Sequence, residues 1–190
     1  MPGLPALTRA EALERVAALI ASLDEPARIA IDGPDAAGKT TLADELAALL
    51  AAERLSADDF LRPAEERHRR GRESPEGYYE DSFDHPRLRG AVLAAQGLVL
   101  VDGIFLLRPE LDDLWSLRIF VAVGEEEMLR RGIERDGADL ERLYRVRYLP
   151  GQRLYAERVG PRERAEVVVE NDDPARPRLV FREGVGRPGA

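Results

Sequence analysis

Gly33-Pro34-Asp35-Ala36-Ala37-Gly38-Lys39-Thr40-Thr41 is the stretch of this 190-residue sequence that decides its fold. It matches G-x-x-x-x-G-K-[ST], in which main-chain N–H groups wrap a phosphate, the lysine reaches the β- and γ-phosphate oxygens, and the hydroxyl can ligate Mg²⁺. The pattern therefore predicts that a nucleoside triphosphate binds along the whole stretch. The alternative is an ordinary glycine-rich turn before a helix.

The basic residues support the first interpretation. Lys39 is the only lysine in the chain, and the other 27 basic residues are arginine. An ammonium group is a compact point charge, whereas a guanidinium group is a planar fork, so the two are not interchangeable beside a crowded phosphate. The retention of one lysine at this position indicates a phosphate-binding role, and we expect Lys39 to take part in catalysis.

Composition narrows the class of protein. With 44% apolar residues, the chain is expected to form a single domain over residues 1–190. The net charge of −8 and the pI near 5.0 argue against nucleic-acid binding, and the absence of cysteine excludes disulfides and thiol chemistry. No apolar run approaches the ~20 residues of a membrane span, and no secretion signal is visible, so a cytoplasmic protein without a membrane partner is expected. The sequence does not indicate the oligomeric state.

Apolar periodicity predicts the order of elements. A capping-box spacing at Thr8 and Glu11 starts an N-terminal helix over about residues 8–23, and an apolar strand at 28–32 leads into the glycine-rich stretch. A helix with a leucine stripe follows that stretch. Further strands are expected at 54–57, 98–101, 117–123 and 165–170, separated by helices at 85–96, 109–114 and 125–136.

This alternation predicts an α/β protein with a mostly parallel five-stranded sheet and helices on both faces. The core should span about residues 28–175 and a C-terminal tail about 176–190. Residues 179–181 could add a short edge strand, and residues 184–190 are expected to fray.

Acidic residues follow two of the expected strands. Asp102 ends the run 98–101, where its carboxylate could hold Mg²⁺ together with Thr40; the alternative is an Asp-Gly turn. Asp58 and Asp59 follow the strand at 54–57, where one carboxylate could accept the proton of an attacking hydroxyl. Their alternative role is a helix cap or turn.

Three other groups could serve a site. The stretch 78–86 combines aromatic and acidic residues, so Tyr79 and Asp84 are candidates for substrate binding, although Asp84 could instead cap a helix. Arg131 and Arg135 share one face of the helix at 125–136 and could meet phosphates from an arginine-rich lid; the alternative is compensation of the helix dipole. The Arg/Glu-rich stretch 62–76 is expected to be a solvated face or mobile loop.

Taken together and in order, several segments resemble the uridine kinase-like branch of the P-loop kinases, which is similar to phosphoribulokinase and pantothenate kinase. These segments span about residues 28–175 and are Ile31–Thr41, Asp58-Asp59-Phe60, Ser82–Pro86, Val101–Phe105, Arg131-x-x-x-Arg135-Asp136 and Tyr148–Tyr155. The resemblance implies transfer of a phosphoryl group from ATP or GTP, with Mg²⁺, to a primary hydroxyl of a small molecule. In uridine kinases this is the 5′-hydroxyl of uridine or cytidine.

The resemblance also implies residue roles. Asp58 matches the catalytic acid of the family, and Asp84 matches the carboxylate that holds ribose hydroxyls. Arg131 and Arg135 match lid arginines near the phosphates, with Arg135 expected in catalysis, and the loop 171–173 matches the segment beside the nucleotide base.

One segment departs from the family pattern. Nucleoside-phosphorylating members carry a base-recognising β-hairpin before the strand that ends in Asp-Gly or Glu-Gly. Here only 14 residues separate Pro86 from Val101, and the expected helix and strand account for all of them. Alternatives to a nucleoside kinase are therefore a kinase for another hydroxylated metabolite and a non-catalytic nucleotide-binding regulatory protein.

Overall fold

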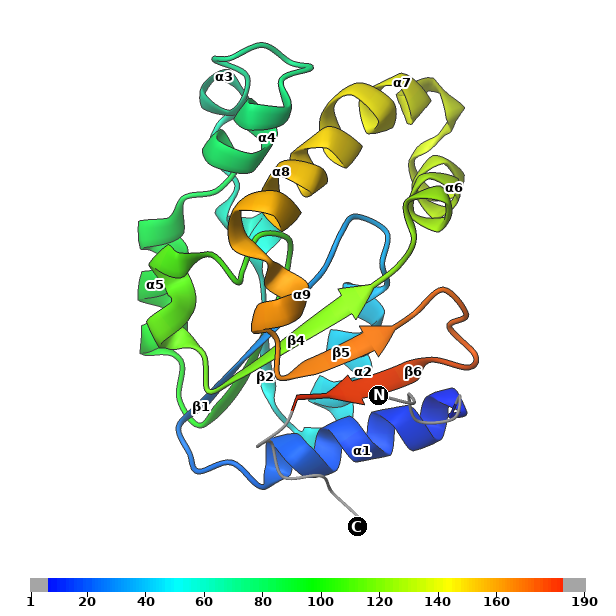
Figure 1. Cartoon of the computed structure of the whole chain (residues 1–190). Helices are drawn as coiled ribbons and strands as arrows, with labels where there is room; N and C mark the ends of the chain where they lie inside the picture. The colour runs from blue at the N-terminus through cyan, green and yellow to red at the C-terminus, as the bar shows by residue number, and fades with distance from the viewer. Residues whose placement is uncertain (1–6, 183–190) are drawn as a thin grey trace.

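A computed structural model describes residues 7–182 of the chain (Figure 1). Its centre is one sheet in the order β2-β3-β1-β4-β5-β6. The strands are β1 (Ala27–Asp32), β2 (Glu53–Ser56), β3 (Leu98–Asp102), β4 (Leu117–Ala122), β5 (Val167–Glu170) and β6 (Arg178–Phe181). The first five run parallel, and β6 pairs antiparallel with β5. The α/β class and the mostly parallel sheet are confirmed.

The expected count of five strands is wrong, because β6 adds a sixth. This strand lies inside the segment that was expected to be a tail from residue 176. Leu179 is buried against the core while its neighbours Arg178 and Val180 face outward, and this alternation suits an edge strand. The residues expected to fray, 184–190, lie outside the described residues.

β1 lies in the middle of the sheet, between β3 and β4. Its side chains alternate between two hydrophobic clusters: Ile29 and Ile31 pack on one face and Ala30 on the other. Burial on both faces explains why the strand sequence is apolar without a polar alternation. The carboxyl end of β1 is therefore held rigidly, and the glycine-rich stretch starts there.

Helices cover both faces, as predicted. On one face lie α1 (Arg9–Ala21) and α2 (Lys39–Leu50). The capping box of α1 forms: Thr8 Oγ1 accepts from the N–H of Glu11, and the Glu11 carboxylate accepts from the N–H of Thr8. On the other face lie α5 (His85–Ala94) and the segment Pro109–Leu114, which is a 3₁₀ helix rather than an α-helix.

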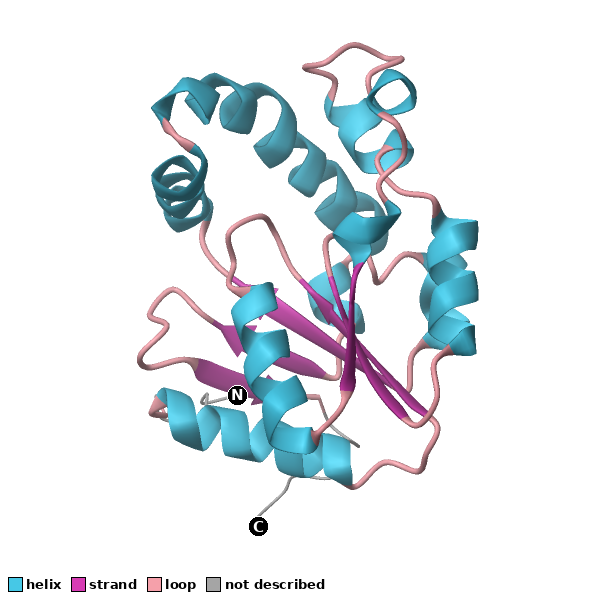
Figure 2. Cartoon of the chain, turned by 180° about the vertical axis from the view of Figure 1, so that it is seen from behind, coloured by secondary structure: helices cyan, strands magenta, loops and turns pink. Residues whose placement is uncertain are grey.

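A third group of helices lies beyond the carboxyl ends of the parallel strands (Figures 1 and 2). One part follows β2 and comprises η1 (Ala57–Phe60), α3 (Ala64–Arg67) and α4 (Pro75–Asp81). The other follows β4 and comprises α6 (Glu125–Asp136), η3 (Ala138–Leu140), α7 (Glu141–Leu143), the π-helical segment η4 (Tyr144–Tyr148) and α8 (Leu149–Val159). The short helix α9 (Pro161–Arg164) follows α8 and lies back against the sheet, where it contacts β4. The charged stretch 62–76 thus contains helical turns. Among the described helices, none has the length and apolar character of a membrane span.

Candidate active site

The glycine-rich stretch forms a tight loop between β1 and α2. Gly33 has φ 152°, and a Cβ there would lie 2.2 Å from the carbonyl oxygen of Val121, so no larger residue fits. Ala36 and Gly38 also have positive φ values, 54° and 92°. Left-handed residues that alternate with ordinary ones, as at 36–38, turn their N–H groups toward a common concavity that suits an anion.

The start of α2 adds to this concavity. Gly38 caps the helix without any side-chain hydrogen bond, so the first amides of α2 have no side-chain acceptor there. The Lys39 ammonium folds back over the loop and donates to the carbonyl of Pro34 at 2.6 Å. Burial lowers the pKa of Lys39, and the nearby carboxylates of Asp35, Asp32, Asp58 and Asp102 oppose this effect. The loop therefore combines a charged ammonium, free amides and a helix N-terminus, a known arrangement for phosphate binding.

Thr40 and Asp102 lie together, as the sequence predicted. The Thr40 hydroxyl donates to one carboxylate oxygen of Asp102 at 2.9 Å, and the guanidinium of Arg54 donates to the other. Hydroxyl and carboxylate oxygens are the donors that Mg²⁺ prefers, usually shared with substrate phosphates and water. These two residues therefore fit a magnesium ion beside the loop. In residues 7–182 there is no cluster of three or more acidic or histidine side chains that would hold a metal by itself.

A buried hydrogen-bond network around Asp32, at the end of β1, holds the glycine-rich loop in place. Asp32 is fully buried and accepts from its neighbour Gly33 N–H at 2.7 Å, from the hydroxyl of Tyr155, and from Leu107 N–H at 3.1 Å. Burial raises the pKa of Asp32, while these donors favour its charged form. The network ties β1 to the segment after β3 and to α8, so three elements fix the loop.

Asp58 and Asp59 have different surroundings. Asp58 lies on η1, at the wall of a cavity of about 330 Å³, whereas Asp59 does not line that cavity. Partial removal from water raises the pKa of Asp58, and the charge of Lys39 lowers it. The neighbouring carboxylates Asp102 and Asp35 also raise this pKa. Asp58 is thus the acid that lies close to both the loop and an open space.

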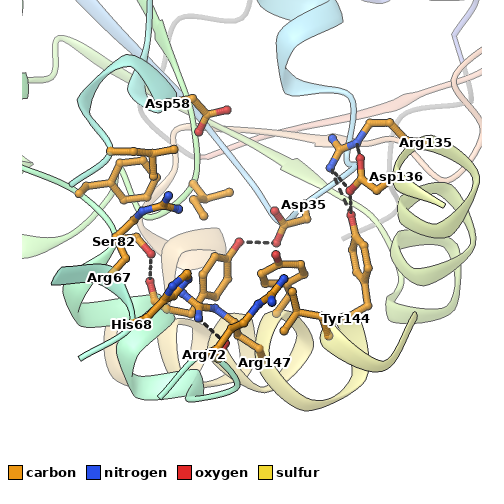
Figure 3. Close-up of a pocket in the computed structure, with 16 residues that line it drawn as sticks. Asp35, Asp58, Arg67, His68, Arg72, Ser82, Arg135, Asp136, Tyr144 and Arg147 are labelled. Carbon is orange, nitrogen blue, oxygen red and sulfur yellow. Dashed lines mark hydrogen bonds and ion pairs between the residues drawn. The ribbon is translucent and has the colours of Figure 1, made fainter. Parts of the chain in front are cut away.

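The cavity lies between η1, α3, α4 and the segment from α6 to η4 (Figure 3). Tyr78 forms part of its floor and donates from its hydroxyl to Asp35 at 2.6 Å, which links α4 to the glycine-rich loop. Tyr144 also lines the cavity and donates to Asp136 at 2.6 Å. The volume is at the lower end of the range for small-molecule sites, about 300–1,000 Å³.

The structure places the two other substrate candidates outside this cavity. Tyr79 is buried beside Phe105 and Tyr155, with the guanidinium of Arg108 over its ring. Asp84 accepts from the N–H of Arg87 at 3.0 Å and caps α5, which is the alternative that the sequence left open. Their roles in substrate binding stay predictions without support from the geometry of this cavity.

The two lid arginines also differ in position. Arg135 lines the cavity and pairs with its neighbour Asp136. Arg131 does not line the cavity: it pairs with Glu127 and donates to the carbonyls of Asn171 and Asp172 at 2.9 Å. Arg131 therefore fixes the loop after β5 against α6.

Asn171 connects that loop to the glycine-rich stretch. Its side-chain amide donates to the carbonyl of Ala37 at 2.7 Å, and its side-chain oxygen is buried without a partner in the described part of the chain. The predicted segment 171–173 thus lies beside the loop.

Comparison with solved structures shows the same architecture elsewhere. A candidate uridine kinase from Bacillus stearothermophilus superposes with a TM-score of 0.67 at 19% identity, over 84% of this chain and 97% of that one. A candidate fructose transport system kinase from Silicibacter sp. TM1040 superposes with a TM-score of 0.65 at 19% identity, over 80% and 95%. The chain shares the α/β fold of these two structures. No protein-family model and no curated protein sequence matches it.

Within this fold, the structure contains no hairpin between α5 and β3. Only residues 95–97 separate these elements. The short spacing between Pro86 and Val101 predicted this difference.

Several cavity residues were not identified from the sequence. Tyr78 was seen only as part of an aromatic cluster, and Arg147 only as one of several arginines after the helix at 125–136, most of them expected to be solvated. Tyr144, Arg67 and His68 were not singled out. The four-residue spacing of Tyr144 and Tyr148 was a usable signal, because both rings fall on one helical face and lie in contact, with centroids 5.0 Å apart.

Proposed function

We propose that this protein transfers the γ-phosphoryl group of a nucleoside triphosphate, ATP or GTP, to a hydroxyl group of a small molecule. The observation that carries this proposal is the position of Asp58, which lies within electrostatic reach of Lys39 in the phosphate-binding loop and also lines a cavity of about 330 Å³. A phosphate loop beside a cavity with a carboxylate at its wall is an arrangement suited to phosphorylation of an alcohol.

The chemical step can be assigned to the residues present. The acceptor oxygen forms a bond to the γ-phosphorus, the bond from that phosphorus to the β–γ bridging oxygen breaks, and a nucleoside diphosphate leaves. Asp58 orients the hydroxyl and accepts its proton; its raised pKa makes it a better base for this purpose.

Other residues hold the donor. The loop amides and Lys39 bind the phosphates, and Arg135, at the cavity wall, supplies positive charge near the transferring group. Thr40 and Asp102 would hold Mg²⁺, which neutralises phosphate charge when bound.

Three variants test the proposal. Lys39→Met should weaken nucleotide binding about 10- to 100-fold, measured by calorimetric titration with magnesium and a non-hydrolysable ATP analogue. Asp58→Asn should lower kcat about 10²- to 10⁴-fold with an unchanged nucleotide Kd. Asp59→Asn is the matched control, since its carboxylate is adjacent in sequence but outside the cavity, and it should keep activity within about twofold.

The acceptor is identified by measuring nucleoside diphosphate release with a panel of nucleosides and other small alcohols. Full activity in Asp58→Asn would contradict the assigned base. Triphosphate hydrolysis that no acceptor stimulates would contradict the kinase and favour a regulatory nucleotide-binding protein. The 5′-hydroxyl of a nucleoside, implied by resemblance to uridine kinases, is one arm of this panel.

A further inference from the structure

The cavity beside Asp58 has a strongly cationic side. Its lining includes Arg67, His68, Arg72 and Arg147. Figure 3 shows Asp58 at one side of the cavity and His68, Arg72 and Arg147 together at the opposite side, with Arg67 between them. The four come from α3, the turn before α4, and η4, so the fold brings together charges that are up to 80 residues apart.

These arginines differ from their neighbours in having no acidic partner. Arg69 and Arg70 both pair with Asp81, and Arg142 and Arg145 pair with Glu73 and Glu141. Among residues 7–182, by contrast, no carboxylate lies within ion-pair distance of Arg67, Arg72 or Arg147. The other acidic residues of the cavity are engaged, Asp35 with Tyr78 and Asp136 with Arg135.

Arg147 is the clearest case of an arginine without an acidic partner. Its side chain is only 3% exposed, its Nε has no hydrogen-bond partner in the described chain, and its Nη1 donates to the backbone carbonyl of Arg72. Its guanidinium also lies over the ring of Tyr78, 5.5 Å from the centroid, which fixes its position on the cavity floor. Burial of a charge without a counter-charge is costly and is found where a ligand supplies that charge.

The pKa shifts of the side chains on the cationic side of the cavity indicate that their positive charges act on one another. Burial, with the charges of Arg147, Arg67 and Arg72, lowers the pKa of His68. Burial lowers the pKa of Arg147 as well, and the repulsion from Arg67 and Arg72 acts in the same direction. The guanidinium groups of Arg67 and Arg72 are therefore close enough to Arg147 to repel its charge.

We propose that the phosphoryl acceptor carries an anionic group, a phosphate or a carboxylate, which Arg67, Arg72 and Arg147 bind while its hydroxyl lies at Asp58. This inference rests on the proposed kinase function and defines its acceptor as a small anionic alcohol. The anionic group is bound and not consumed. A neutral nucleoside would leave the cationic side of the cavity without a counter-charge.

A binding experiment tests the anion site without depending on turnover. The full chain, with its loop saturated by MgADP, is titrated with inorganic phosphate and, separately, with acetate, and heat is recorded by calorimetry. At least one of the two should bind, and Arg147→Gln and Arg72→Gln should each weaken that binding about 30-fold. Arg72 is exposed, so its replacement leaves the packing intact if Arg147→Gln fails to fold.

Arg145→Gln is the matched control. It lies two residues from Arg147 on η4, is exposed and pairs with Glu141 outside the cavity, so it should leave anion binding within about twofold. The inference is overturned if neither phosphate nor acetate binds, or if binding is the same in the two cavity variants and in the control. The larger response of the two anions identifies the acceptor class.

A turnover experiment separates this inference from the kinase proposal. Acceptor pairs that differ in one group are compared, namely glycerol with glycerol 3-phosphate and with glycerate, and ribose with ribose 5-phosphate. The anionic member should have the higher kcat/KM, and Arg147→Gln should raise its KM with little change in kcat. Turnover of uridine equal to that of every anionic alcohol contradicts the anion site alone. MgATP that fails to bind wild-type protein contradicts the proposed kinase function, and with it the acceptor.

Discussion

At the scale of single residues, His85 gives the molecule a predictable response to acid. It is the first residue of α5, half-buried, with its ring stacked near that of Phe83 at 6.5 Å between centroids. Burial lowers its pKa to about 4, and the positive charge of Arg108 acts in the same direction. His85 is therefore neutral in the folded protein at pH 5 to 7, where an unfolded histidine becomes protonated.

The low pKa of His85 determines how the free energy of unfolding changes with pH. Because the folded pKa is below the unfolded value, the stabilisation is complete above about pH 6.5 and is lost as the pH falls toward 4. Between pH 7.5 and 5, His85 should cost the wild type about 2 kcal/mol in free energy of unfolding. Urea titrations of wild type and His85→Gln across this range should show a steeper decline for wild type; parallel curves would contradict the assignment.

The positions of single residues could be predicted from the sequence where a short motif fixes the backbone conformation. Thr40 and Asp102 were expected together and lie in hydrogen-bond contact. Residues such as Arg147 could not be identified, because their significance depends on which carboxylates the fold leaves distant. A sequence lists 28 basic and 36 acidic residues but does not say which of them pair.

At the scale of elements, the strands were easier to predict than the helices beyond them. β1, β3 and β4 are buried apolar runs whose periodicity is independent of their neighbours. α4, which begins at the end of the charged stretch 62–76, was missed, although Ser74 followed by Pro75 is a helix-start signal and Ser74 does cap the helix. The helical run from α7 through α8 was also missed, since Pro150 interrupts its sequence pattern.

The contact between α6 and η4 depends on a glycine. A Cβ at Gly132 would lie 2.3 Å from the ring of Tyr144, whereas a Cβ at Gly90 in α5 would meet nothing within 4 Å. Gly132→Ala should therefore destabilise the protein by about 1–3 kcal/mol, because the ring cannot move without breaking its bond to Asp136. Gly90→Ala is the control and should stabilise by about 0.5–1 kcal/mol.

Thermal or urea unfolding measures both changes. Equal effects of the two substitutions would show that helix propensity alone decides them, and would contradict the close packing of α6 on Tyr144.

At the scale of the whole molecule, buried side chains are distributed unevenly. Every residue of β1 except Arg28 is buried, while α3, η3 and α7 contribute no buried residue. Elements with few buried contacts open locally at low free-energy cost. These three short helices should therefore open more readily than the central sheet.

Hydrogen exchange followed by mass spectrometry tests this distribution. Amides in residues 64–67 and 138–143 should exchange at least about 100-fold faster than those in residues 29–31. Addition of magnesium nucleotide and an acceptor should slow exchange in the two fast segments. Uniform protection over the described chain would contradict the expected difference.

The use of arginine in place of lysine also has a practical consequence. Reagents that acylate primary amines can modify only the Lys39 side chain and the α-amine of this protein. Burial lowers the pKa of Lys39, so more of it is in the reactive, uncharged form than an ordinary lysine would show, although access to it is narrow. Intact-mass analysis after brief acylation should show the Lys39 adduct disappear as magnesium nucleotide is added, and would thereby read the occupancy of the loop without any enzymatic assay.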